Sequence, residues 1–137
     1  MNGPVICGVD DSDVAAGAID VARELARRYE LPLLYAHVRR GNTNDDTAPG
    51  RIHDAAGAGH ANVTIERGHP ADRLVALTHE RGASFLVVGN HGPRSSLLGS
   101  ISADVARRAA CPVVVVPPTA TAGREIDGAT HPIRTVA

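Results

Sequence analysis

Residues 85–117 read FLVVGNHGPRSSLLGSISADVARRAACPVVVVP and carry the strongest signal of the fold. The apolar runs 85–88 and 113–116 are rich in β-branched residues, which predicts two buried strands. The amphipathic stretch 102–110 between them predicts a helix. A strand, a helix and a second strand in this order predict two parallel strands joined by a crossover helix.

The glycines and serines between the first of these strands and the helix predict an anion site. Gly89 and Gly92 follow the strand, where glycine permits positive φ and a close approach of the backbone. Gly99, Ser100 and Ser102 come next, so free backbone N–H groups, two hydroxyls and the positive end of the helix dipole would converge on one phosphate. The same residues also fit an ordinary tight turn and, for Ser102, a helix cap.

The rest of the chain repeats the alternation of strands and helices. Further strands are predicted at 4–9, 31–38 and 63–66, and further helices at 14–29 and 70–81. Strands that alternate with helices predict a parallel sheet covered on both faces.

Two segments do not follow this pattern. Residues 39–60 contain many loop formers and glycines, and we expect one short helix there. Residues 118–137 lack periodicity and are interpreted as a tail rather than a domain, in which 132–136 can add an edge strand, including one added to a partner in a dimer.

Composition limits the class of function. The 137 residues fit one domain, and the core is aliphatic because the chain has no Trp, one Phe and two Tyr. Fourteen basic and fifteen acidic side chains give a net charge of −1, which argues against a main role in binding nucleic acid or an anionic membrane. Arg107 and Arg108 instead suit solvated positions at the negative end of the last helix.

The cysteines and the N-terminus bear on the compartment. Cys7 and Cys111 lack metal-type spacing and lie in or beside apolar runs, which favours buried free thiols in a reducing cytosol. The first ten residues do not have the pattern of a signal peptide, and no apolar stretch approaches about 18 residues. We therefore expect a cytoplasmic protein.

In a doubly wound sheet, ligands bind beyond the carboxyl ends of the strands where the winding direction reverses. If the first and fourth strands are neighbours, the loop 8–12 meets the glycine turn, and a metal-bound nucleotide could be held between them. Asp10, Asp11 and Asp13 could together chelate Mg²⁺. In the alternative interpretation, Asp10 alone is functional, and Asp13 stabilises the first turn of the helix through the helix dipole. The seven histidines show no compact pattern of zinc ligands.

Six short motifs together resemble the universal stress protein family. The resemblance covers residues 5–117, and its motifs are GVDDS at 8–12, AHV at 36–38, GHPAD at 68–72, ASFLVVGNHG at 83–92, LLGSIS at 97–102 and CPVVVVP at 111–117. It implies an α/β domain over 1–117 with a doubly wound, five-stranded parallel sheet of the adenine nucleotide alpha hydrolase-like (Rossmann-like) kind, followed by the tail 118–137. It also implies a homodimer joined through the last strand, 113–116.

The resemblance further implies which residues bind an adenine nucleotide. Adenine and ribose contacts fall on Gly8, Val9, Asp10 and Val38, with Asp10 accepting a hydrogen bond from a ribose hydroxyl. The phosphate loop falls on Val88, Gly89, Gly92, Gly99, Ser100, Ile101 and Ser102. Mg²⁺ or Mn²⁺ would bridge phosphate oxygens.

One departure from the family pattern concerns the phosphates. The ATP-binding branch has the pattern G-x2-G-x9-G-[S/T], but here only the six residues PRSSLL separate Gly92 from Gly99. Three consequences of this shorter loop are compatible with the sequence. The site binds a shorter nucleotide, it binds ATP more weakly, or Arg94 takes a different position near the phosphates.

Three functions follow from the sequence and the resemblance. The first is an adenine nucleotide-binding stress-response regulator or sensor, and the second is a dimeric interaction protein of the same fold that binds no nucleotide. The third is a slow ATPase, which is less favoured because the sequence offers no convincing general base or transition-state arginine. No catalytic residue and no protein metal ligand is assigned.

Overall fold

The computed structural model describes residues 2–9, 14–40, 61–90, 100–117 and 134–136, and the elements below lie within these ranges. In chain order they are β1 (Val5–Gly8), α1 (Val14–Tyr29), β2 (Leu33–Arg39), β3 (Ala61–Arg67), α3 (Pro70–Glu80), β4 (Phe85–Gly89), α4 (Ser100–Arg108), β5 (Val113–Val116) and β6 (Arg134–Val136). The short helix expected within 39–60 falls almost entirely outside the described residues.

The strands form one sheet in the order β3-β2-β1-β4-β5-β6. The first five are parallel, which confirms the predicted sheet, and Ile6 of β1 pairs with Leu34 of β2 on one side and Leu86 of β4 on the other. The sixth strand comes from the tail and runs antiparallel to β5, with Thr135 opposite Val114. The winding direction reverses between β1 and β4, so the predicted switch point is present.

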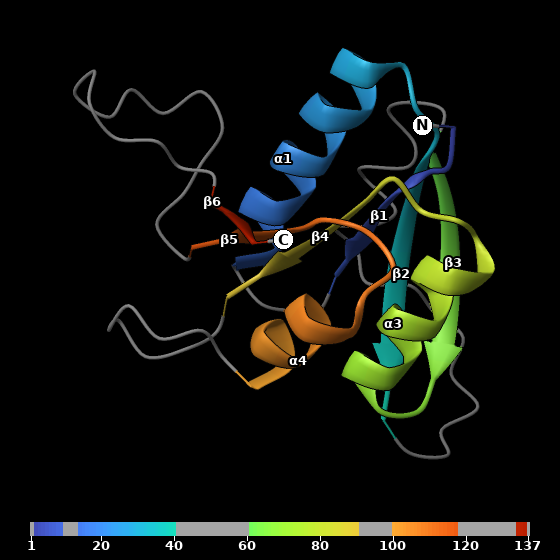
Figure 1. The fold of residues 1–137 in the computed structure, drawn as a ribbon, viewed down its shortest axis with the longest axis vertical. Helices are drawn as coiled ribbons and strands as arrows, with labels where there is room; N and C mark the ends of the chain where they lie inside the picture. Colours follow the sequence, from blue (N-terminus) through green and yellow to red (C-terminus); the bar gives the residue numbers. More distant parts are fainter. Residues whose placement is uncertain (1, 10–13, 41–60, 91–99, 118–133, 137) are drawn as a thin grey trace.

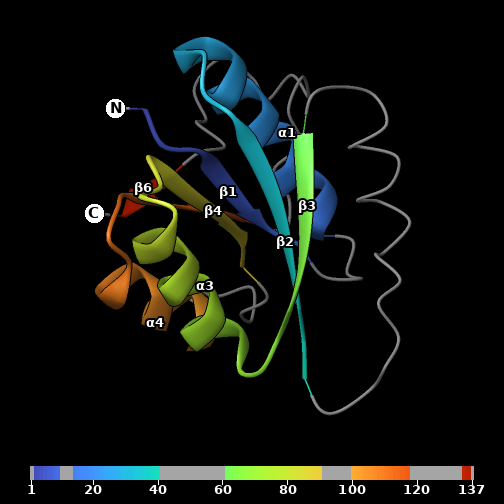
Figure 2. The same cartoon turned by 90° about the vertical axis from the view of Figure 1, so that its right-hand side faces the viewer.

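Helices cover both faces of the sheet, α1 on one and α3 with α4 on the other (Figure 1 and Figure 2). Because successive side chains of a strand point to opposite faces, Val5 and Cys7 join the core under α1, whereas Ile6 joins the core under α3 and α4. The described part of the chain therefore has two aliphatic cores, one on each side of the sheet.

Small side chains let α1 lie close to the sheet. Ala18, Ala22 and Ala26 are buried at four-residue intervals along it, so they form one apolar face against the sheet. Tyr29 at its end is 51% exposed, and its ring lies 5.6 Å from that of Phe85. These contacts fix the position of the helix that follows β1.

The other helices agree with prediction except at their ends. Pro70 opens α3, and Gly82 follows it with a φ of +57°, a conformation that glycine adopts without strain. Helix α4 begins at Ser100 and ends at Arg108, two residues earlier than predicted at each end. Ser102 therefore lies inside the first turn of α4 and does not cap it.

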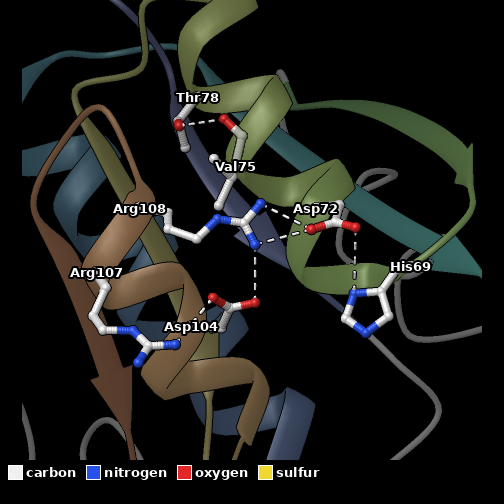
Figure 3. A network of polar contacts seen from close by, with 7 residues as sticks. All are labelled: His69, Asp72, Val75, Thr78, Asp104, Arg107 and Arg108. Carbon is white, nitrogen blue, oxygen red and sulfur yellow. Dashed lines mark hydrogen bonds and ion pairs between the residues drawn. The ribbon is translucent and has the colours of Figure 1, made fainter.

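A polar network on the outer surface joins α3 to α4 (Figure 3). The Arg108 guanidinium donates to the Asp72 carboxylate at 2.8 and 2.9 Å and to Asp104 at 3.0 Å. Arg108 thus lies exposed in the last turn of α4, as expected, and it also reaches a carboxylate on the neighbouring helix, which the sequence did not indicate. Arg107 pairs with Asp104 on its own helix at 3.3 Å.

Beneath this network a single hydroxyl joins the same helices. Thr78 is fully buried, and its Oγ1 donates to the Val75 carbonyl at 2.6 Å. The same oxygen accepts a hydrogen bond from the Ala110 N–H at 3.1 Å, just after α4. The α3–α4 contact thus combines a buried neutral bridge with exposed ion pairs.

Candidate nucleotide site at the carboxyl edge of the sheet

Gly8 and Val88 lie side by side where β1 and β4 end. The pairing of Cys7 with Val87 brings them level, and a Cβ atom added to Gly8 would lie 3.4 Å from Val88 Cγ1. It would lie 3.1 Å from Cδ1 of Leu74 on α3, closer than side chains normally pack. A side chain here would therefore press on Leu74, so the glycine lets α3 lie close to the end of β1, a role that the motif alone did not reveal.

Val9, directly after β1, is held to β2 through both of its backbone polar groups. Its N–H donates to the Ala36 carbonyl at 2.9 Å. Its carbonyl accepts a hydrogen bond from Nδ1 of His37 at 2.7 Å. His37 is only 7% exposed, so the chain leaving β1 is held at Val9 by a buried imidazole.

A second side chain joins the end of β4 to the start of α4. The Ser102 hydroxyl donates to the Gly89 carbonyl at 3.2 Å, and Ser102 is 3% exposed. The next residue, Asn90, donates its backbone N–H to the Val116 carbonyl at 2.9 Å. Because the Ser102 proton is given to Gly89, this hydroxyl positions α4 against β4, and only the backbone N–H of Ser102 remains as a predicted phosphate donor.

Apolar side chains from three elements lie on the α3 and α4 side of this edge. Val88 is buried in the core under these helices, and the half-buried Val38 and Ile101 pack against the same core. Ser100 opens α4 and is exposed. The described edge thus offers an apolar margin, suited to a base, and the amino end of a helix, suited to an anion.

Three predicted site residues, Asp10, Gly92 and Gly99, lie outside the described residues, as does Arg94. The other eight lie at the ends of β1, β2 and β4 or in the first turn of α4: Gly8, Val9, Val38, Val88, Gly89, Ser100, Ile101 and Ser102. Their role in binding stays a prediction. His37 was missed, although a histidine next to the end of an apolar strand in the AHV motif was a signal that could have identified it.

The described residues offer little for metal or thiol chemistry. Among them, no group of three or more His, Cys, Asp or Glu side chains could hold a metal ion. Both cysteines are free, and burial raises the pKa of Cys7 strongly and that of Cys111 to about 11. Burial therefore disfavours the thiolate form of both cysteines. No helix in the described ranges is both long and apolar enough to cross a membrane.

Comparisons with known proteins agree with the motifs and the fold. A model of the universal stress protein family matches residues 51–117. Universal stress protein MT1672 of Mycobacterium tuberculosis (strain CDC 1551 / Oshkosh) is 35% identical, over 82% of this chain and 94% of the relative. Universal stress protein YxiE of Bacillus subtilis (strain 168) is 26% identical, over 85% and 99%.

A crystal structure of a universal stress protein in complex with cAMP has the same fold. Its TM-score is 0.70 at 30% identity, and the match covers 83% of this chain and 96% of that one. Motifs, sheet order and sequence identity agree, and the chain belongs to the universal stress protein family.

Proposed function

We propose that this protein binds an adenine nucleotide at the carboxyl edge of β1, β2 and β4 and acts as a cytoplasmic stress-response regulator. The observation that carries the proposal is the convergence, at the switch point of the sheet, of the end of β1 with the amino end of α4. The Ser102–Gly89 hydrogen bond fixes α4 against β4, the strand next to β1. In open α/β sheets this is where ligands bind.

The groups at this edge suit the parts of a nucleotide. Val38 is half-buried and offers apolar contact to adenine. The first N–H groups of α4 have no partners within the helix and favour an anion through the helix dipole. Asp10 follows Val9 directly and would accept a hydrogen bond from a ribose hydroxyl.

A nucleotide with one phosphate group fits the proposal better than ATP. Six residues between Gly92 and Gly99, three fewer than in the ATP-binding pattern, leave less backbone to surround outer phosphates. The 30% identical relative was crystallised in complex with cAMP, which has a single phosphate. We therefore expect cAMP or AMP to bind more tightly than ATP, and Mg²⁺ to affect only the binding of ATP.

Calorimetric titration of nucleotide-free protein tests this proposal. cAMP, AMP and ATP are each added with and without Mg²⁺ to the wild type, to Asp10→Ala and to Asp20→Ala, a matched aspartate change on α1. Loss of a charged hydrogen bond predicts an affinity about 10- to 100-fold lower in Asp10→Ala and unchanged affinity in Asp20→Ala. If the wild type binds none of the three, the proposal is wrong.

A nucleotide-independent homodimer is the second candidate, and β6 bears on it directly. β6 pairs with β5 in the same chain, so a dimer that pairs β5 with β5 requires β6 to leave that edge. Light scattering on the full chain and on a chain ending at Pro117 tests this. A shortened chain that dimerises more strongly supports β5 as the dimer strand, whereas equal monomer fractions contradict it.

A further inference from the structure

We infer that His37 is a positioning residue for nucleotide binding, because its buried imidazole holds the backbone of Val9 at the end of β1. The inference rests on the proposed function. It adds to the proposed site a residue that does not itself contact the nucleotide. It begins from the hydrogen bond of 2.7 Å between Nδ1 of His37 and the carbonyl of Val9, which lies 28 residues away in sequence.

The chemistry of this contact identifies which ring nitrogen donates. A carbonyl oxygen can only accept, so Nδ1 carries the proton and donates it. In the neutral ring Nε2 then has no proton, and the ring holds one defined tautomer. A buried carbonyl without a partner costs free energy, so this bond favours one position of the Val9 peptide over displaced ones.

The location of the contact gives it a consequence for the site. Val9 immediately precedes Asp10, and His37 immediately precedes Val38, so the bond joins the two strand ends that carry the proposed adenine and ribose contacts. Because neighbouring residues of a strand face opposite ways, Val38 packs on the α3 and α4 side while His37 lies on the other. The imidazole thus supports the edge without occupying the apolar margin.

An alternative is that His37 only satisfies a polar group in the core. In that case its loss would loosen the whole sheet evenly. A positioning role predicts a local effect instead, because the N–H of Val9 bonds to Ala36 beside the imidazole contact, whereas the N–H of Val5 bonds to Pro32 at the other end of the same strand pair.

Amide hydrogen exchange separates these two roles without any ligand. His37→Leu removes the donor, and His37→Asn keeps an N–H at the position of Nδ1. We expect exchange at Val9 to rise about tenfold more than at Val5 in His37→Leu, and to return to near the wild-type rate in His37→Asn. Equal acceleration at both amides, or no rescue by Asn, would overturn the inference.

Binding of cAMP then tests the consequence for the site, with Thr78→Val as a variant destabilised away from this edge. We expect affinity about five- to tenfold lower in His37→Leu, and near wild type in His37→Asn and Thr78→Val. Wild-type affinity in His37→Leu, or an equal loss in Thr78→Val, would contradict the inference. No binding by the wild type would overturn the proposed function instead, and hydrogen exchange would then decide the positioning role alone.

Discussion

The carboxyl edge of the sheet and the outer surface of α3 and α4 are both joined by side-chain hydrogen bonds, but of opposite kinds. At the edge, His37 and Ser102 are buried, and each donates to one backbone carbonyl. On the surface, Arg108 meets Asp72 and Asp104, and the side chains of Arg108 and Asp72 are 41% and 61% exposed. Judged by donor–acceptor distance alone, the surface contacts would be as strong as the buried ones.

We expect the burial of each hydrogen bond, rather than its length, to determine how much it contributes to the free energy of unfolding. Exposed ion pairs exchange contacts with water for contacts with each other and are screened by salt, so their net effect is small. A buried carbonyl or N–H that loses its partner cannot recover one from water, and the full desolvation cost remains. The surface network is thus expected to modulate the α3–α4 contact, whereas the buried contacts fix backbone positions.

Of the substitutions Thr78→Val, Ser102→Ala and Asp72→Asn, the first is expected to lower stability most. Valine keeps the shape but removes both hydrogen bonds of the buried Thr78 hydroxyl, the one to the Val75 carbonyl and the one from the Ala110 N–H. We expect a loss of about 1–3 kcal/mol in the free energy of unfolding, measured by urea denaturation. Thr78→Ser retains the hydroxyl and should lose less. A valine variant as stable as the wild type would break the distinction between buried and exposed contacts.

Ser102→Ala is expected to have a smaller effect, because it removes one hydrogen bond of 3.2 Å, whereas Thr78→Val removes two shorter ones. We expect about 1 kcal/mol of lost stability from the unpaired Gly89 carbonyl. Ser100→Ala is the matched control, since Ser100 lies in the same turn of α4 but is exposed. Equal losses in the two variants would contradict a specific contribution of the bond to β4, because alanine is the better helix former and propensity alone predicts no loss.

Periodicity predicted the elements well because it reports burial within one segment. The bounds of α1 and β5 were predicted to the residue, since alanines at four-residue intervals and a run of valines each indicate one kind of packing. The start of α4 was placed two residues late because Ser100 and Ser102 both resemble cap residues. Only the contact with Gly89 on another element distinguishes them.

Contacts across long sequence separations were beyond the reach of local patterns. The bond from His37 to Val9 spans 28 residues, and the bond from Arg108 to Asp72 spans 36. Each arises because the sheet order brings distant segments together, and no spacing rule encodes that order. The site was therefore predicted as a set of backbone positions, while the side chains that support it required the structure.

The Arg108–Asp72 pair should have the smallest effect, and its dependence on pH and salt makes it measurable. The hydrogen bond from Arg108, with a smaller contribution from its charge, holds the pKa of Asp72 below its ordinary value. A carboxyl with a lowered pKa in the folded state adds stability above its unfolded-state pKa and loses it as the pH falls through the folded one. Asp72→Asn should therefore lower the Tm slightly at neutral pH, by less than Ser102→Ala, and not at all in strong acid.

Salt gives an independent test of the same pair. At about 1 M salt the Debye length falls to about 3 Å, so an exposed pair retains little of its attraction. The coupling in a double-mutant cycle of Asp72→Asn and Arg108→Gln should then shrink towards zero, while the loss in Thr78→Val stays the same. A coupling that persists in both acid and high salt would show that Arg108 stabilises α3 and α4 by packing, because its long aliphatic stem can cover apolar surface whatever the charge of its partner.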